Sequence, residues 1–244
     1  MAGECSIVKG LEVVRGEVSH WQRLSRFHYR GERLAAHSGI WVLRHKQGTY
    51  KQSGREPVGV IVYKMPSAGC RMRNVALGQI FKGLDRGTQL QLVNRMIRSI
   101  ARVVVEPRYR GLGLASRLVR ETLELAGTPV VEAMGVMGWV NPFFERAGMK
   151  AYRGAEPLRG ARLREAFSVV GIEEDELTDA RRVQEKIDRL AQSEERFIDE
   201  QIQALLESYG PKRRKMERGE KRTEFALSKL TARPVYYVWM KEDD

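Results

Sequence analysis

The amino-acid sequence predicts an α/β protein, and three observations lead to this prediction. Short apolar runs of strand composition alternate with helical patterns through the first two thirds of the chain. At residues 103–116 a run of valines passes through a glycine-containing turn into a helical pattern. Residues 235–240 have the β-branched and aromatic composition of a further strand. We therefore expect one sheet with helices packed against it.

The strands and helices of the first 137 residues follow in an order that the apolar patterns define. Two of the strands suit a hairpin, because the polar stretch that begins at His45 and separates them has turn composition. Residues 65–86 contain scattered Pro, Gly and Asn, and we expect an irregular loop there. The predicted elements are a strand at 11–14, a helix at 19–29, the hairpin strands at 40–43 and 58–63, a helix at 89–97, a strand at 101–105, a helix at 112–126 and a strand at 129–137.

The last third of the chain has a different composition. Residues 158–230 are helical and strongly charged, and an apolar stripe predicts one long helix over 179–209. We expect a sixth strand at 150–152 and a seventh at 235–240, separated by roughly 80 residues, which is far longer than an ordinary loop. The predicted organisation is a body at 1–157, a charged helical insertion at 158–233, and a segment at 234–244 that returns to the sheet.

The positive charge of the chain is unevenly distributed. The formal net charge is +12, but residues 160–233 hold sixteen Lys or Arg and sixteen Asp or Glu, and residues 241–244 contribute −2. Residues 1–159 therefore carry +14. Such an excess indicates a polyanionic partner such as DNA or RNA, and the alternative is a basic surface that only favours solubility. The run Lys212–Lys215 predicts an exposed loop, which is either a solvated turn or a phosphate-binding segment.

Several classes of protein are not expected. No apolar run approaches the roughly 20 residues that span a bilayer, and the first residues lack a signal-peptide core, so we expect a cytoplasmic protein without a membrane partner. Cys5 and Cys70 are the two cysteines, and their positions fit neither a disulfide framework nor a zinc site.

The turn within 103–116 has the properties of an anion site. The first N–H groups of a helix lack intrahelical partners and carry partial positive charge, so a diphosphate can settle on them if no bulky side chain intervenes. Gly111 and Gly113 remove that bulk. The turn is neither a Walker loop nor a dinucleotide fingerprint, because the first needs Gly-Lys-Ser/Thr and the second needs glycine where Ser116 stands.

Two motifs resemble those of the GNAT superfamily of acyl-CoA-dependent N-acyltransferases. The spacing Arg108-x-x-Gly111-x-Gly113 resembles the signature of the loop that holds the pyrophosphate of acetyl-CoA. Asn141 to Met149, Asn-Pro-Phe-Phe-Glu-Arg-Ala-Gly-Met, resembles the short helix and turn after the fifth strand of that fold. The resemblance implies a mixed, mostly antiparallel sheet in which strands four and five splay apart. It also implies acetyl-CoA or another acyl-CoA as cosubstrate, and no metal.

The resemblance assigns acyl-CoA binding to strand four, the turn and the second motif. Strand four would serve as a template for the pantetheine arm, since its backbone groups beside the splay have no neighbouring strand. The implied cofactor-binding residues are Val103, Val104, Val105, Arg108, Tyr109, Arg110, Gly111, Leu112, Gly113, Leu114, Ala115, Ser116, Asn141 and Phe144.

The general acid and base depart from the family pattern. Phe144 stands where many GNAT proteins have the tyrosine that protonates the thiolate, so Tyr109, Tyr152 or water would have to substitute. Arg102 stands where many relatives carry a carboxylate on strand four.

Three other residues are candidates for the chemistry. Glu132 lies in an apolar strand pattern, and it is either catalytic, ion-paired or outward-facing. His28 and Tyr29 follow the first helix, where the resemblance places a wall of the acceptor site, and their alternative is a structural role.

The arrangement looks like the acetyltransferase-like half that is fused to certain ABC-type ATPases. The residues that carry this likeness are His28 to Gly31, the second motif and the start of the last strand. It admits an ABC-type ATPase as a partner. A looser analogy is to phage Mom-like proteins that modify DNA bases.

The sequence therefore favours direct acyl transfer to an amine, with a nucleic-acid base or a nucleic-acid-bound target as acceptor. The alternatives are a protein or small-amine acetyltransferase whose insertion forms a homodimer, and a non-catalytic module on the same scaffold that binds nucleic acid or another partner.

Overall fold

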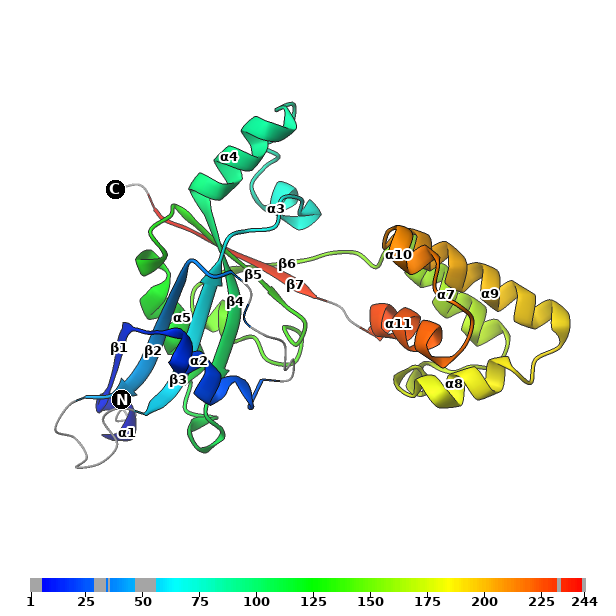
Figure 1. Ribbon diagram of the computed structural model, residues 1–244, viewed down its shortest axis with the longest axis horizontal. Coiled ribbons are helices and arrows are strands. Elements are labelled where there is room, and N and C mark those ends of the chain that lie inside the picture. Colours follow the sequence, from blue (N-terminus) through cyan, green and yellow to red (C-terminus); the bar gives the residue numbers. More distant parts are fainter. Residues whose placement is uncertain (1–5, 29–33, 35, 47–55, 232–233, 243–244) are drawn as a thin grey trace. The chain divides into compact units, whose positions relative to one another are not determined.

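A computed structural model describes the chain except for residues 1–5, 29–33, 35, 47–55, 232–233 and 243–244. The chain divides into two compact units. The first, here called the sheet unit, comprises residues 1–153 and 234–244, and the second, the helical unit, comprises residues 154–233. Figure 1 shows the elements of both units along the chain.

The sheet unit is built on one seven-stranded sheet of order β1-β2-β3-β4-β5-β7-β6. Neighbouring strands run antiparallel, except that β4 and β5 are parallel. The predicted α/β class and the mixed, mostly antiparallel sheet are confirmed. The strands are β1 (Leu11–Arg15), β2 (Gly39–His45), β3 (Pro57–Lys64), β4 (Ile97–Val105), β5 (Val130–Gly135), β6 (Lys150–Arg153) and β7 (Val235–Met240).

Strands β4 and β5 part halfway along their length. They pair only from Ile97 to Ile100 on β4, opposite Val130 to Ala133 on β5. Beyond that point β4 stays on β3 as far as Val105, while β5 continues with β7 to Gly135. The predicted splay is therefore present, and it leaves the backbone groups on one side of residues 101–105 without a strand partner.

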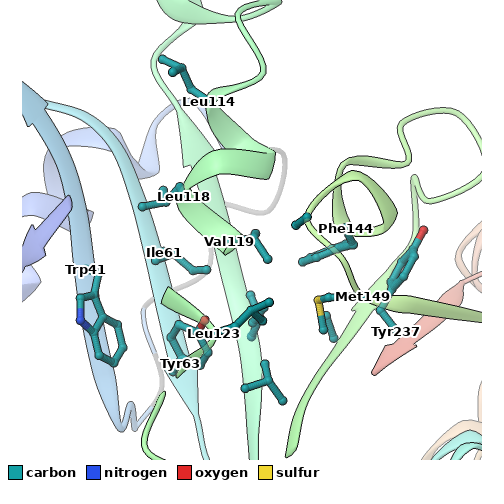
Figure 2. Packing of buried hydrophobic residues seen from close by; sticks show 14 of the residues in the cluster. Trp41, Ile61, Tyr63, Leu114, Leu118, Val119, Leu123, Phe144, Met149 and Tyr237 are labelled. Carbon is teal, nitrogen blue, oxygen red and sulfur yellow. The ribbon is translucent and has the colours of Figure 1, made fainter. Parts of the chain in front are cut away.

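Helix α5 (Leu114–Thr122) covers one face of the sheet. Its residues Leu114, Leu118 and Val119 are buried in one core cluster with Ile61 and Tyr63 of β3 (Figure 2). Burying a side chain of this size contributes about 1.5–3 kcal/mol, so the apolar stripe is enough to hold the helix on the sheet. This packing fixes the start of α5 beside the end of β4.

The helices α2 (Val18–Ser25), α3 (Arg71–Ala76) and α4 (Arg86–Met96) pack with residues of two other clusters. Trp21 and Leu24 of α2 pack in a cluster with Val60 and Val62 of β3 and with Val104 of β4. Tyr29, which lies in the part of the helix predicted beyond α2, is outside the described residues. Helix α2 therefore ends next to strand β4.

Several predicted boundaries were wrong. The expected loop at 65–86 contains helix α3, and helix α4 begins at Arg86 because the Asp85 carboxylate accepts hydrogen bonds from the N–H groups of Gly87 and Thr88. Strand β4 begins at residue 97, because its first four residues pair with β5. Helix α5 ends at Thr122 and is followed by the 3-10 turn η2 (Glu124–Ala126).

The helical unit has an apolar core of its own, formed by helices α7, α8, α9 and α11. The single helix predicted at 179–209 is two helices, because the chain turns at residues 188–191. A continuous helix of that length would extend about 45 Å, whereas the turn lets Val183 of α8 and Ile198 of α9 enter one core. The run expected as a loop at 212–215 is partly helical. The helices are α7 (Leu158–Val169), α8 (Ala180–Ile187), α9 (Gln192–Glu207), α10 (Pro211–Arg214) and α11 (Glu220–Thr231), with the 3-10 helix η3 at Glu174–Thr178.

Candidate active site

The turn between β4 and α5 is held open by two glycines. A 3-10 helix, η1 (Pro107–Tyr109), follows β4, and the Glu106 N–H donates to the Val58 carbonyl at 2.8 Å. Gly111 and Gly113 have φ angles of +81° and +73°, in the left-handed region that favours glycine. A Cβ atom on either glycine would meet no protein atom within 4 Å. The space over the turn is therefore open.

Six successive N–H groups at this turn have no acceptor in the described part of the chain. They belong to residues 111–116, and the first backbone bond beyond them runs from the Arg117 N–H to the Gly113 carbonyl at 3.1 Å. Residues 111–113 are exposed, whereas the Leu114 and Ser116 side chains are buried beneath the turn. Unsatisfied donors and the helix dipole together make this a site for an anionic group.

Two arginines border the turn. The Arg108 side chain is 74% exposed and pairs with the Glu106 carboxylate. The Arg110 guanidinium lies at 3.4 Å from the carbonyls of Val105 and Phe27. Because Phe27 follows α2, this contact brings the end of that helix, where His28 lies, to the edge of the turn. The sequence predicted both segments for one site, and the structure brings them together.

Tyr109 ties the turn to strand β2. Its hydroxyl lies 3.0 Å from Nε2 of His45, which is only 4% exposed. The Tyr109 hydroxyl, one of the predicted substitute acids, is thus engaged with an imidazole. Sequence reasoning missed His45, because it stands where strand composition gives way to turn composition.

The three valines of β4 alternate between the faces of the sheet. Val104 packs with Trp21 of α2, whereas Val103 and Val105 pack in the cluster on the α5 side. On the β3 side the backbone of this segment is paired. Its other side borders the splay, where an extended ligand can add hydrogen bonds as a further strand would.

Glu132 is fully occupied by partners from its own chain. The Arg73 guanidinium donates from Nε and Nη2 to the two carboxylate oxygens at 2.8 Å each, and the Tyr236 hydroxyl donates to Oε2 at 2.8 Å. The side chains of Arg73 and Glu132 are 2% and 5% exposed. Burial, with the Glu132 charge in second place, raises the pKa of Tyr236. The ion pair was one of the predicted alternatives, and a catalytic role for Glu132 stays a prediction.

The second motif forms the short helix α6 (Phe143–Arg146). Phe144 is 6% exposed, and its ring lies 4.9 Å from that of Tyr237 on β7 (Figure 2). The Tyr237 hydroxyl has no hydrogen-bond partner in the described part of the chain, and burial raises its pKa. Asn141 precedes α6 and is exposed. A buried hydroxyl therefore adjoins the position of the missing tyrosine, and no sequence pattern could have indicated it.

Exposed apolar side chains follow β5 where the strands part. The Arg153 guanidinium lies 5.1 Å from the Trp139 ring and donates to the Glu145 carboxylate at 2.7 Å. The exposed apolar side chains form a rim that starts at the splayed end of β5. Its exposed members are Met134, Met137, Trp139 and Val140.

Neither a metal-binding cluster nor a membrane-spanning helix is found among the described residues. They contain no group of three or more His, Cys, Asp or Glu side chains that could hold a metal ion. None of the described helices has the length and apolar character needed to cross a membrane.

Comparison with protein families gives the open turn and the splay a common explanation. The model of the acetyltransferase (GNAT) family matches residues 13–149, more than half of the chain, from β1 through the second motif. The chain belongs to the GNAT acetyltransferase family. It is accordingly an N-acetyltransferase that uses acyl-CoA as its cosubstrate.

The solved structures that this chain resembles share little sequence with it. No curated protein matches significantly. The structure of Arabidopsis thaliana NAA60 with acetyl-CoA shares 14% identity over 59% of this chain and 90% of that one, with a TM-score of 0.42. The NatC complex bound to Gag peptide and CoA shares 13% identity over 61% and 89%, with a TM-score of 0.35. A mutant agmatine N-acetyltransferase in its apo form shares 14% identity over 59% and 86%, with a TM-score of 0.32.

Proposed function

We propose that this GNAT protein transfers an acetyl group directly from acetyl-CoA to an amine of a nucleic acid or of a molecule bound to nucleic acid. The observation that carries the proposal is the open turn between β4 and α5, with its six unsatisfied N–H groups. These donors would bind the pyrophosphate, and the unpaired side of β4 would bind the pantetheine arm.

The reaction requires one bond to form and one to break. The amine nitrogen attacks the thioester carbonyl carbon, the carbon–sulfur bond breaks, and CoA leaves as a thiolate that takes a proton. N–H groups of β4 at the splay would stabilise the negative charge on the carbonyl oxygen. The amine gives up one proton, and His28 is the described titratable side chain at the end of α2 beside the turn.

Protonation of the thiolate needs a donor other than Phe144, whose ring carries no hydroxyl. Tyr237 is buried against this ring, and its raised pKa keeps the hydroxyl protonated at neutral pH. We assign the proton donor to Tyr237 or to water that enters the splay. Tyr237→Phe separates the two, because it lowers kcat about tenfold or more if the hydroxyl is the acid and leaves kcat unchanged if water is.

The charge and the shape of the sheet unit favour a nucleic acid as acceptor. Residues 1–159 carry +14, and the exposed Arg108 and Arg110 stand at the turn itself. The rim after β5 presents Trp139, which is 55% exposed and can stack on a base. A polyanion with planar bases fits both features.

The first test is calorimetric titration with acetyl-CoA. Gly111→Trp fills the open space over the turn, and Gly127→Trp is its matched control, because Gly127 also has a positive φ and no atom within 4 Å of a Cβ position. We expect binding in the wild type and in the control, and none in Gly111→Trp. Equal binding by all three proteins would overturn the site assignment.

The second test compares acceptors under one set of conditions. Labelled acetyl-CoA is supplied with single-stranded and duplex nucleic acid, with a lysine-containing peptide, and with small diamines. Label on nucleic acid supports the proposal. Label only on the peptide or on the diamines contradicts the acceptor and indicates a protein or small-amine acetyltransferase.

A further inference from the structure

The helical unit carries a cluster of cations and aromatic rings around α10 and α11. The Arg213 guanidinium lies 4.4 Å from the Phe225 ring, and the Lys229 ammonium lies 4.8 Å from the same ring and 5.5 Å from the Tyr209 ring. The two rings meet edge to face at 5.6 Å. We call this cluster the cation–aromatic patch, and its members are Tyr209, Lys212, Arg213, Arg214, Lys215, Phe225 and Lys229.

The basic run of the patch lacks acidic partners. Lys212 to Lys215 form no ion pair with a carboxylate of the described residues, and three of the four side chains are exposed. Many other cations of the unit are paired: Arg182 and Lys186 with Glu176, and Arg222 with Asp199. The unit has no net charge over residues 160–233, so the four cations of this run are a local excess of positive charge.

The aromatic part of the patch is open to solvent. Tyr209 is 40% exposed, although partial burial raises its pKa. Cations around a partly exposed ring are the arrangement that binds single-stranded nucleic acid, with phosphates on the cations and a base stacked on the ring. An anionic bilayer would require apolar side chains that insert, and Tyr209 is the large hydrophobic residue that is exposed within residues 209–229.

We propose that the cation–aromatic patch binds single-stranded nucleic acid. The proposal extends the proposed function by giving it a second contact with the acceptor, but it can hold or fail separately. The helical unit leaves the sheet after Arg153 and returns before Val235, and these two residues pair with each other. Val235 also pairs with Gly135, at the end of β5 that is splayed from β4. Nucleic acid bound by the helical unit would therefore be tethered to the sheet unit and raised in effective concentration there.

The test measures binding of a fluorescent single-stranded oligonucleotide to the full chain by anisotropy, over a range of salt concentrations and without acyl-CoA. Lys212→Gln, Arg214→Gln and Lys215→Gln are combined in one variant. Its control combines Arg181→Gln, Arg189→Gln and Arg196→Gln, which removes the same charge from exposed positions of the same unit. We expect the affinity of the patch variant to fall about tenfold to a hundredfold near 0.1 M salt. The slope of log K against log salt should become less negative by about 2, and the control should change little in both.

Tyr209 provides a second and independent readout. Tyr209→Leu should weaken binding about fivefold or more at every salt concentration without changing the slope, and Tyr209→Phe should restore it, because a phenyl ring also stacks. Equal affinities and slopes for the patch variant and its control would overturn the proposal. So would binding of the patch to anionic vesicles but not to the oligonucleotide.

The two proposals fail in different ways. If the patch variant loses oligonucleotide binding while nucleic acid is never acetylated, the inference stands and the proposed acceptor falls. If nucleic acid is acetylated equally well by the wild type and the patch variant, and both bind the oligonucleotide equally, the inference falls and the proposed function stands.

Discussion

The turn at 106–116 and the Glu132 site were both candidate functional sites in the sequence. In the structure they differ in whether their polar groups have partners. Each places polar groups beside an apolar strand. The turn was the predicted cofactor-binding site, and Glu132 was a candidate catalytic residue. At the turn, six N–H donors have no partner in the described chain. At Glu132, both carboxylate oxygens accept hydrogen bonds from Arg73, and one also accepts from Tyr236. Polar groups satisfied by their own chain stabilise the fold, whereas groups left unsatisfied at an exposed turn are available to a ligand.

The largest effect is expected from breaking the closed site. Arg73→Met leaves the Glu132 carboxylate buried without its counter-ion, and we expect the free energy of unfolding to fall by about 3–5 kcal/mol. Urea unfolding measures this change. Arg73→Met combined with Glu132→Leu should recover most of the loss, since no charge then remains buried. Normal stability with abolished acetyl transfer in Glu132→Gln would instead make Glu132 catalytic.

A substitution at the open turn should weaken ligand binding strongly and reduce stability only slightly. Gly111→Trp should weaken acetyl-CoA binding at least about a hundredfold, because two hydrogen bonds to charged oxygens are worth about 1.5 kcal/mol each. Its unfolding free energy should fall only by about 1–2 kcal/mol, the strain of a side chain at positive φ, and equally in Gly127→Trp. A stability loss confined to Gly111→Trp would show that the turn is part of the structural core.

Alkaline pH should destabilise the closed site. Burial, followed by the Glu132 charge, raises the pKa of Tyr236, so the folded protein keeps this proton at a pH where the unfolded chain loses it. The contribution of Tyr236 to the free energy of unfolding is complete below about pH 10. Above that pH it falls by at most about 1.4 kcal/mol per pH unit for this one group. Urea unfolding between pH 8 and 11 checks this, and Tyr236→Phe should make the profile less steep, with the remaining slope due to the other buried tyrosines. An equally steep profile in the wild type and the variant would contradict it.

The smallest effect is expected at the exposed edge of the open site. Arg108→Gln should weaken acetyl-CoA binding about twofold to fivefold at low salt, and the difference should disappear at high salt, because the side chain is 74% exposed and its charge is screened. Arg95→Gln, an exposed change on α4, serves as control. A salt-independent loss would indicate a direct, desolvated contact of Arg108 with the ligand.

What the sequence could predict depended on the distance between partners along the chain. The turn is local, so residues 103–116 were sufficient to predict it. Arg73 lies 59 residues before Glu132, on a helix within an expected loop, and its pairing could not be inferred from either segment. The ring of Tyr237 on β7 packs against the ring of Phe144 on α6, which a strand pattern cannot indicate. The break at 188–191 was missed because the apolar period continues through it.

Strand β7 has a consequence for how the protein is made on the ribosome. It lies between β5 and β6, yet it follows the whole helical unit in the chain. While residues 154–233 are being translated, which takes on the order of 4–16 s, β5 and β6 wait with an empty place between them. The helical unit can therefore fold first, and the sheet is completed only when β7 leaves the ribosome. A chaperone or a transient partner that covers these two edges during that interval would protect the nascent protein from aggregation.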